Sequence, residues 1–131
     1  NNTITGNSGN NILDGAGGQD TLNGGDGNDT LTETGNNNTL NGDAGQDTIT
    51  ATGDGNTLNG GDDVDTLIAT GDSNTLNGNE GNDSLTVLSG QNNYLNGNEG
   101  NDTLIATGNG NQLSGGAGDD TLTATGEYLY I

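Results

Sequence analysis

Aliphatic residues recur at every ninth position along this chain. The series runs through Ile4, Leu13, Leu22, Leu31, Leu40, Ile49, Leu58, Leu67, Leu76 and Leu85, and after one extra residue it continues through Leu95, Leu104, Leu113, Leu122 and Ile131. A nine-residue unit is too short to bury an apolar face alone, so successive units must stack on one another. The pattern therefore predicts a solenoid with the aliphatic residues inside.

Two kinds of nine-residue unit alternate from residue 24 onward. The first carries an acidic, glycine-rich turn before its aliphatic residue, at 24–31, 42–49, 60–67, 78–85, 97–104 and 115–122. The second reads Ala-Thr-Gly-x-x-Asn-Thr-Leu-Asn, as in 51–59. One coil of 18 residues therefore contains two short strands and two turns of different chemistry, and the chain has room for about seven coils.

Each predicted strand alternates with a period of two residues. In 48–52, Ile49 and Ala51 face inward and three threonines face outward. On the other side of the coil, in 57–59, only Leu58 is expected inside. No stretch has the periodicity of a helix, so the fold class is all-β.

We expect a single domain over residues 1–131. Its first coil, at 1–23, is looser than the regular coils at 24–125, and 126–131 forms a cap or a junction, either to a flanking module or to another copy of the chain end to end. The extra residue near Val87, Leu88 and Ser89 predicts a β-bulge rather than a domain boundary.

Composition adds a strong charge constraint. The chain has 27 Gly, only 24% hydrophobic residues and a net charge of −19, with no Lys, Arg or His. By composition alone it would be disordered, but the nine-residue pattern concentrates its few apolar residues in one place. The carboxylates would repel one another in a compact rod unless a cation is supplied from outside.

The same composition excludes several functions. A chain this acidic cannot displace counterions from nucleic acid, and no apolar run reaches the roughly 18 residues of a membrane span. The absence of Cys excludes disulfides and thiolate metal sites and is compatible with an extracellular setting. We expect no enzyme activity, because the acidic pairs repeat in every coil, whereas an active site is a single asymmetric constellation.

The acidic turn resembles the RTX (repeat-in-toxin) nonapeptide GGxGxDxUx, in which U is a large aliphatic residue. The resemblance implies a right-handed parallel β-roll in which calcium lies between successive turns. It also implies a secreted or cell-surface structural module that folds on calcium binding outside the cell. The carboxylate ligands that it implies are the sixth-position residues Asp29, Asp47, Asp65, Asp83, Asp102 and Asp120. The backbone carbonyl ligands that it implies belong to Gly24, Asp26, Gly42, Ala44, Gly60, Asp62, Gly78, Glu80, Gly97, Glu99, Gly115 and Ala117.

Physical chemistry agrees with calcium at these turns. Neighbouring strands lie ~4.8 Å apart, so one cation can reach carboxylates of two coils, and six stacked turns leave five gaps for about five Ca²⁺ ions. Oxygen ligands without His or Cys exclude zinc and copper as the natural metal. Some turns depart from the motif: Asp63 replaces the fourth-position Gly, and Asp43, Asn79 and Asn98 replace the second.

The opposite turns have different chemistry. Their sixth position is Asp20 once and then Asn38, Asn56, Asn74, Asn93 and Asn111. A neutral amide is a poorer calcium ligand than a carboxylate, so we expect these Asn to form a hydrogen-bonded ladder without metal.

Outward threonines offer an alternative function. The columns comprise Thr30, Thr32, Thr48, Thr50, Thr52, Thr66, Thr70, Thr86, Thr103, Thr107, Thr121, Thr123 and Thr125. Such an array is similar to the ice-binding faces of β-solenoid antifreeze proteins, so ice or another regular surface is a possible partner. Interruptions at Ile68, Leu88 and Ile105, with Glu33 at the edge, favour the simpler interpretation that Thr is a good exposed strand residue.

Overall fold

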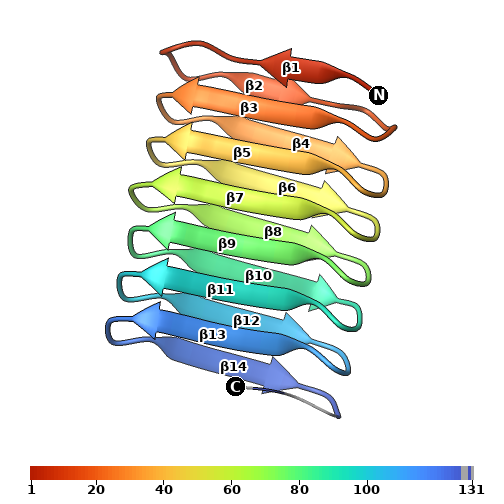
Figure 1. Ribbon diagram of the computed structural model, residues 1–131, viewed down its shortest axis with the longest axis vertical. Coiled ribbons are helices and arrows are strands. Elements are labelled where there is room, and N and C mark those ends of the chain that lie inside the picture. The colour runs from red at the N-terminus through yellow and green to blue at the C-terminus, as the bar shows by residue number, and fades with distance from the viewer. Residues whose placement is uncertain (128–129, 131) are drawn as a thin grey trace.

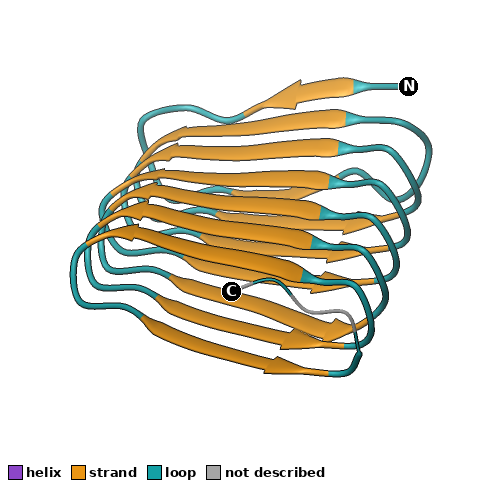
Figure 2. Cartoon of the chain, turned by 60° about the horizontal axis from the view of Figure 1, so that its bottom comes forward, coloured by secondary structure: helices purple, strands orange, loops and turns teal. Residues whose placement is uncertain are grey.

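The computed structural model describes residues 1–127 and 130, which form two parallel β-sheets packed face to face (Figures 1 and 2). Within these residues the chain passes to the other sheet after every strand. They contain no helix, so none that is long and apolar enough to cross a membrane. Tyr128 and Leu129 of the expected cap, and Ile131 of the nine-residue series, lie outside the described residues.

Each sheet has seven strands in the described part of the chain. The first sheet comprises β1 (Thr3–Thr5), β3 (Thr21–Asp26), β5 (Thr39–Ala44), β7 (Thr57–Asp62), β9 (Thr75–Glu80), β11 (Tyr94–Glu99) and β13 (Gln112–Ala117). The second sheet comprises β2 (Ile12–Asp14), β4 (Thr30–Thr34), β6 (Thr48–Thr52), β8 (Thr66–Thr70), β10 (Ser84–Ser89), β12 (Thr103–Thr107) and β14 (Thr121–Thr125).

Neighbouring strands pair in the register that the nine-residue pattern requires. Leu40 of β5 pairs with Leu22 of β3 and with Leu58 of β7, each 18 residues away. Since the repeat and the register coincide, like residues stack on like residues through the whole sheet. The prediction of an all-β parallel solenoid of about seven 18-residue coils is confirmed.

The interior consists of narrow columns of small and large side chains. The aliphatic series is fully buried from Leu22 to Leu104, and its members near the two ends of the stack, Ile4, Leu13 and Leu122, are partly buried. The second inward column of the second sheet consists of Glu33, Ala51, Ala69, Val87, Ala106 and Ala124.

Glu33 differs from its expected position. The sequence predicts it at the edge of the threonine array, but it faces inward, and only 1% of its surface is exposed. The strand alternation causes this, because Thr32 and Thr34 on either side of it point outward. An ionisable side chain therefore occupies a core position.

The strands of the first sheet are longer than expected. The first three residues of each acidic turn from 24–29 onward continue the preceding strand, so Gly60 is buried beside Leu58, which is not the only inward residue of β7. The reversal itself takes three residues, as at 27–29. Positions two and four have positive φ, and where they are not Gly they are Asp or Asn, as in Asp43 (75°) and Asp63 (74°). These residue types tolerate the left-handed region best.

The extra residue forms the expected bulge. The pairing of β10 with β8 shifts between Val87 and Ser89, and Leu88 is 59% exposed. The register recovers within the same coil, because Leu95 pairs with Leu76 and Leu85 with Leu104. The insertion is thus absorbed locally.

Replacing a core leucine should be much more harmful than replacing the bulge leucine. Leu67→Ala should lower the free energy of unfolding by about 2–5 kcal/mol, because it leaves a cavity in a close-packed column. Leu88→Ala is the matched control and should change it by less than about 1 kcal/mol, because the side chain is largely exposed. Chemical denaturation of the folded proteins under identical conditions measures both, and equal losses would contradict the assignment of the core.

Candidate metal centre

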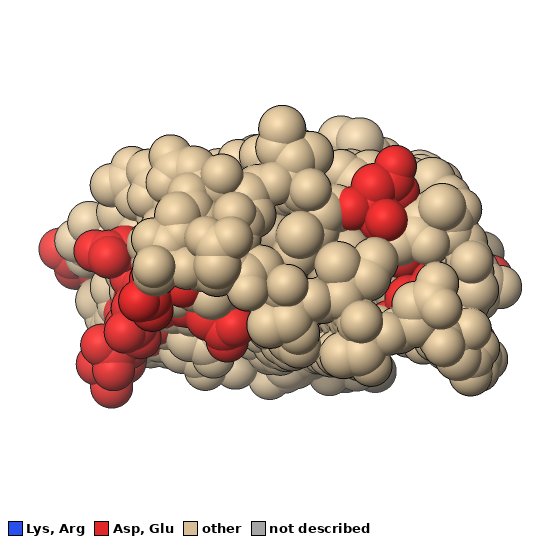
Figure 3. All heavy atoms as spheres, turned by 90° about the horizontal axis from the view of Figure 1, so that it is seen from above, with Lys and Arg blue, Asp and Glu red and all other residues tan. Residues whose placement is uncertain are grey.

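One edge of the solenoid carries a column of aspartates, here called the Asp edge. Its members are Asp29, Asp47, Asp65, Asp83, Asp102 and Asp120, each at the end of the turn that leads from the first sheet into the second. The first five are buried, with 1–2% of their surface exposed. Viewed along the stack, acidic side chains gather mainly at this edge (Figure 3).

One carboxylate oxygen of each Asp on this edge accepts a backbone N–H from the preceding coil. The backbone N–H of Asp65 donates to Oδ1 of Asp83 at 2.8 Å. The same bond links each of the other neighbouring pairs, at 2.7–2.9 Å. It also forms between Asp83 and Asp102, so the column continues past the inserted residue.

The second carboxylate oxygen has no partner. Oδ2 is buried and makes no hydrogen bond in Asp29, Asp47, Asp65, Asp83 and Asp102. A buried acceptor without a donor costs about 1–3 kcal/mol, and more when it is charged. The chain has no Lys, Arg or His that could neutralise these atoms.

A glycine at position one of each turn makes room for these free oxygens. A Cβ atom on Gly60 would collide with Oδ2 of Asp65 and would lie 2.7 Å from the carbonyl oxygen of Gly78, in the next coil. The same arrangement occurs at the four other turns with a free Oδ2, which begin at Gly24, Gly42, Gly78 and Gly97. Carboxylate and carbonyl oxygens from two coils therefore converge, and these are the ligands that calcium prefers.

The other expected carbonyl ligands lie at position three of the turns. Those of Ala44, Asp62, Glu99 and Ala117 each accept a backbone N–H from the preceding coil at 2.8–3.3 Å. A carbonyl oxygen retains a second lone pair after one such bond. No three acidic side chains converge within the described residues, so a cation here would need backbone oxygens as well as carboxylates.

Burial raises the pKa of the central carboxyl groups. It brings the pKa of Asp65 to about 7 and those of Asp47 and Asp83 to about 6. The backbone hydrogen bond to each group lowers the pKa, and neighbouring carboxylates raise it again. The pKa of Asp102 is raised for the same reasons.

The opposite edge, here called the Asn edge, is defined by Asp20, Asn38, Asn56, Asn74, Asn93 and Asn111. The backbone N–H of Asn38 donates to Oδ1 of Asn56 at 2.9 Å, and its Nδ2 donates to the same oxygen at 3.0 Å. The backbone bond repeats from Asp20 to Asn111. The expected Asn ladder is confirmed.

The sequence reading missed a further turn of the Asp edge, at 6–11. The backbone N–H of Asn11 donates to Oδ1 of Asp29 at 2.7 Å, so Asn11 occupies the sixth position in the coil that precedes Asp29. A Cβ atom on Gly6 would collide with Oδ1 of Asn11 and with the carbonyl oxygen of Gly24. The spacing from Gly6 to Asn11 was the available signal, but the turn lacks an acidic residue.

The exposed face of the first sheet carries a second ladder that the sequence reading also missed. Side-chain amide groups are linked by hydrogen bonds of 2.7–2.8 Å, in which Nδ2 of one Asn donates to Oδ1 of the Asn in the preceding coil. They run from Asn77 to Asn59, from Asn59 to Asn41 and from Asn41 to Asn23. The recurrence of Asn after Leu in each coil was its signal.

Comparison with known families agrees with this geometry. The RTX calcium-binding nonapeptide repeat matches residues 1–31, 34–67, 59–92, 68–104 and 88–122. The chain belongs to this family. The resemblance seen in the acidic turns is confirmed, and the RTX repeats make this a calcium-binding β-roll module. Searches of curated proteins and of solved structures found no match.

Without calcium, the folded RTX chain should be more stable at about pH 5 than at about pH 8. A raised carboxyl pKa means that the folded state binds protons more tightly than the unfolded chain. That contribution to the free energy of unfolding is complete below the unfolded pKa of 3.8 and is lost as the pH rises through about 6 to 7. Circular dichroism in chelator across this range measures the folded fraction. Asp65→Asn should weaken the dependence, and a folded fraction that grows with pH would contradict it.

Proposed function

We propose that this chain is a structural module that binds about five Ca²⁺ ions in a line along the Asp edge. The observation that carries the proposal is the column of buried Oδ2 atoms without hydrogen-bond partners in a chain without basic side chains. Each ion would take carboxylate oxygens from two successive coils and the backbone carbonyls at positions one and three of the turns. Asp47, Asp65, Asp83 and Asp102 would each serve two ions, and Asp29 and Asp120 one each.

The spacing and the charge favour calcium over other metals. Adjacent coils lie ~4.8 Å apart, and calcium accepts six to eight oxygens in flexible geometry, whereas magnesium requires a tighter octahedron. Five divalent ions would neutralise ten of the nineteen negative charges. Turn 6–11 offers an amide in place of a carboxylate, so the gap between Asn11 and Asp29 would be a weaker calcium site.

Metal binding would be coupled to folding. Without an ion, the uncompensated carboxylates oppose a core that consists of narrow columns, so the apo chain would be largely unfolded near neutral pH. A segment of this kind stays unfolded where calcium is scarce and becomes a stiff rod where calcium is abundant. We therefore propose a secreted or cell-surface setting, with possible flanking modules or end-to-end self-association. We propose no enzymatic role and no binding of nucleic acid or insertion into a membrane.

Calcium titration of matched variants tests the assignment of the two edges. Millimolar calcium should produce strand signal cooperatively, and magnesium should substitute poorly. Asp65→Asn should weaken the calcium midpoint or reduce the number of bound ions, because it removes a carboxylate from two adjacent sites. Asn56→Ala should leave the number of ions unchanged, because it removes only hydrogen bonds of the ladder.

Two results would contradict the proposal. A circular dichroism spectrum that chelator does not change would exclude calcium-dependent folding. Equal losses of calcium in Asp65→Asn and Asn56→Ala would mean that the edges are assigned wrongly.

Ice or another regular surface remains a second candidate partner, for the outer face of the second sheet. The in-register pairing of Thr48 with Thr30 and with Thr66 favours it, because it repeats the same hydroxyl and methyl groups at the strand spacing. Ile68 and Ile105 replace threonines in β8 and β12, and Leu88 projects from the bulge in β10, so the array is uneven from β8 to β12. The threonine columns of the first two regular coils, in β4 and β6, are complete.

Thermal hysteresis of the calcium-loaded protein separates the two candidates. If the face binds ice, the wild-type protein should depress the freezing point and Thr50→Tyr should abolish most of the effect while the strand signal is retained. Thr57→Tyr, on the outer face of the other sheet, is the control and should have no effect. A wild-type protein without hysteresis would exclude ice as the partner.

A further inference from the structure

The first turn of the Asn edge, at 15–20, differs from the turns stacked on it. It has Gly15 at position one and Asp20 at position six, which is the combination found on the Asp edge. The later turns of the Asn edge begin instead with Glu33, Ala51, Ala69, Val87 and Ala106 and have Asn at position six. Gly15 precedes Glu33 in the same inward column, because β2 pairs with β4 with Asp14 opposite Thr32.

Glu33 fills the space that the missing Cβ of Gly15 leaves open. A Cβ atom on Gly15 would collide with Oε2 of Glu33 and would lie 3.2 Å from a methyl group of Leu22. On the Asp edge the corresponding space is occupied by Oδ2 of the turn's own Asp. Oε2 of Glu33 therefore takes, in turn 15–20, the place that the free carboxylate oxygen takes in the acidic turns.

Two carboxylate oxygens without partners result from this arrangement. Oε2 of Glu33 and Oδ2 of Asp20 are both buried and make no hydrogen bond, and the side chains are 1% and 2% exposed. Their other oxygens are engaged: Oε1 accepts the backbone N–H of Thr34 at 2.8 Å, and Oδ1 accepts that of Asn2 at 2.5 Å. The α-amino group of Asn1 lies 3.7 Å from Oδ1 of Asp20.

Both free oxygens face the same turn: Oε2 of Glu33 lies at Gly15, and Oδ2 of Asp20 would lie 3.0 Å from a Cβ atom on Gly18. Burial raises the pKa of Glu33, the N–H of Thr34 lowers it, and the negative charges of Asp20 and Asp14 raise it further. No basic side chain exists in the sequence to relieve this repulsion, and the α-amino group of Asn1 lies near the engaged Oδ1 of Asp20, while Oδ2 of Asp20 and Oε2 of Glu33 have no hydrogen-bond partner. Two buried carboxylates in this state require a proton or a cation.

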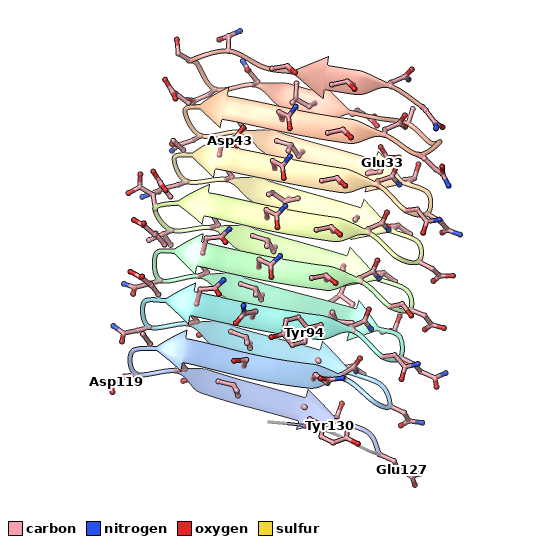
Figure 4. The ribbon with its side chains drawn as sticks, in the orientation of Figure 1. Glu33, Asp43, Tyr94, Asp119, Glu127 and Tyr130 are labelled. Atoms are coloured by element: carbon pink, nitrogen blue, oxygen red, sulfur yellow. The ribbon has the colours of Figure 1, made fainter. Side chains whose placement is uncertain are left out.

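We propose that Asp20 and Glu33 bind one additional calcium ion, inside the first coils at the Asn edge and separate from the line of ions on the Asp edge. Figure 4 shows Glu33 towards the edge opposite Asp43 and Asp119. Its ligands differ in kind from those of the Asp edge, because one carboxylate comes from a core position of a strand rather than from a turn. The site cannot repeat in later coils, where a methyl group of Ala or Val fills position one and a neutral amide stands at position six.

Counting bound calcium in matched variants tests this site. Glu33→Ala introduces the residue that four later members of the same column have, and Asp20→Asn introduces the residue that the next five members of the Asn edge have. Each should bind one calcium ion fewer than the wild type at saturation, by native mass spectrometry on samples whose strand signal in calcium is intact. Asp54→Asn is the control: it removes one negative charge from an exposed residue of the same edge and should keep the wild-type count.

The outcomes separate this site from the Asp edge. If both variants keep the wild-type count, the additional site does not exist and Glu33 is buried as a neutral acid, while calcium binding on the Asp edge stands. If the wild type binds no calcium, the proposed function fails together with this site. If Glu33→Ala does not fold, the calcium count of Asp20→Asn tests the site. That variant should fold, because its amide would extend the hydrogen-bonded ladder that Asn38 to Asn111 already form.

Discussion

A column of buried, unpaired carboxylates governs this structure. Apolar burial is the main stabilising contribution in ordinary cores, but here the apolar part is two rows of Leu or Ile with mostly Ala or Gly beside them. The Asp edge places five partnerless oxygens along one side of that core, one per coil. The repulsion among them has the same period as the stack itself. A cation or proton that neutralises one carboxylate is therefore needed again at every coil. This is why the Asp residues recur with the same period as the strands.

At position six of the turns, a single side-chain atom distinguishes the two edges. Oδ1 of Asp65 and Oδ1 of Asn56 accept the same kind of bond, from a backbone N–H of the preceding coil. The difference lies in the second atom of the side chain. Nδ2 of Asn56 is a donor and reaches the carbonyl oxygen of Gly35 at 3.0 Å, and Nδ2 of Asn111 reaches that of Gly108 at 3.0 Å. Within the Asn ladder only Nδ2 of Asn74 is buried without a partner, and it carries no charge. Oδ2 of Asp65 can only accept, it has no donor, and the carbonyl oxygen of Gly78 near it is also an acceptor, so it needs a positive charge.

The repeat made most of the fold predictable from the sequence. The nine-residue series fixed the strand register, the inward residues and the bulge at Leu88, because in a solenoid each unit has the same neighbours as the last. The length of the first-sheet strands was not predictable in this way. Glycines such as Gly60 were read as turn residues, but the narrow interior accepts them as inward strand positions. Local propensity and tertiary packing pointed in different directions there, and packing prevailed.

The candidate site shows the same division. The positions of the six Asp followed from spacing, and the Asn ladder followed from the chemistry of the amide. Glu33 was missed because a charged residue among threonines suggests exposure, although the alternation that places Ala51 inward also places Glu33 inward. The pairing of β2 with β4 adds that Glu33 lies next to Gly15, where the missing Cβ leaves room for its carboxyl group. The ligands themselves stay a prediction, since their geometry depends on the ion.

The direction of the buried ladders gives the rod a polarity. On both edges, the backbone N–H of one coil donates to the side chain of the coil that follows it in sequence, as from Asp47 to Asp65 and from Asn38 to Asn56. A coil is thus completed by its successor. Losing coils from the N-terminal end uncovers side-chain oxygens, whereas losing them from the C-terminal end uncovers backbone N–H donors, and water can solvate both. The two ends of the stack therefore present opposite groups along each edge: acceptors at the N-terminal end and donors at the C-terminal end.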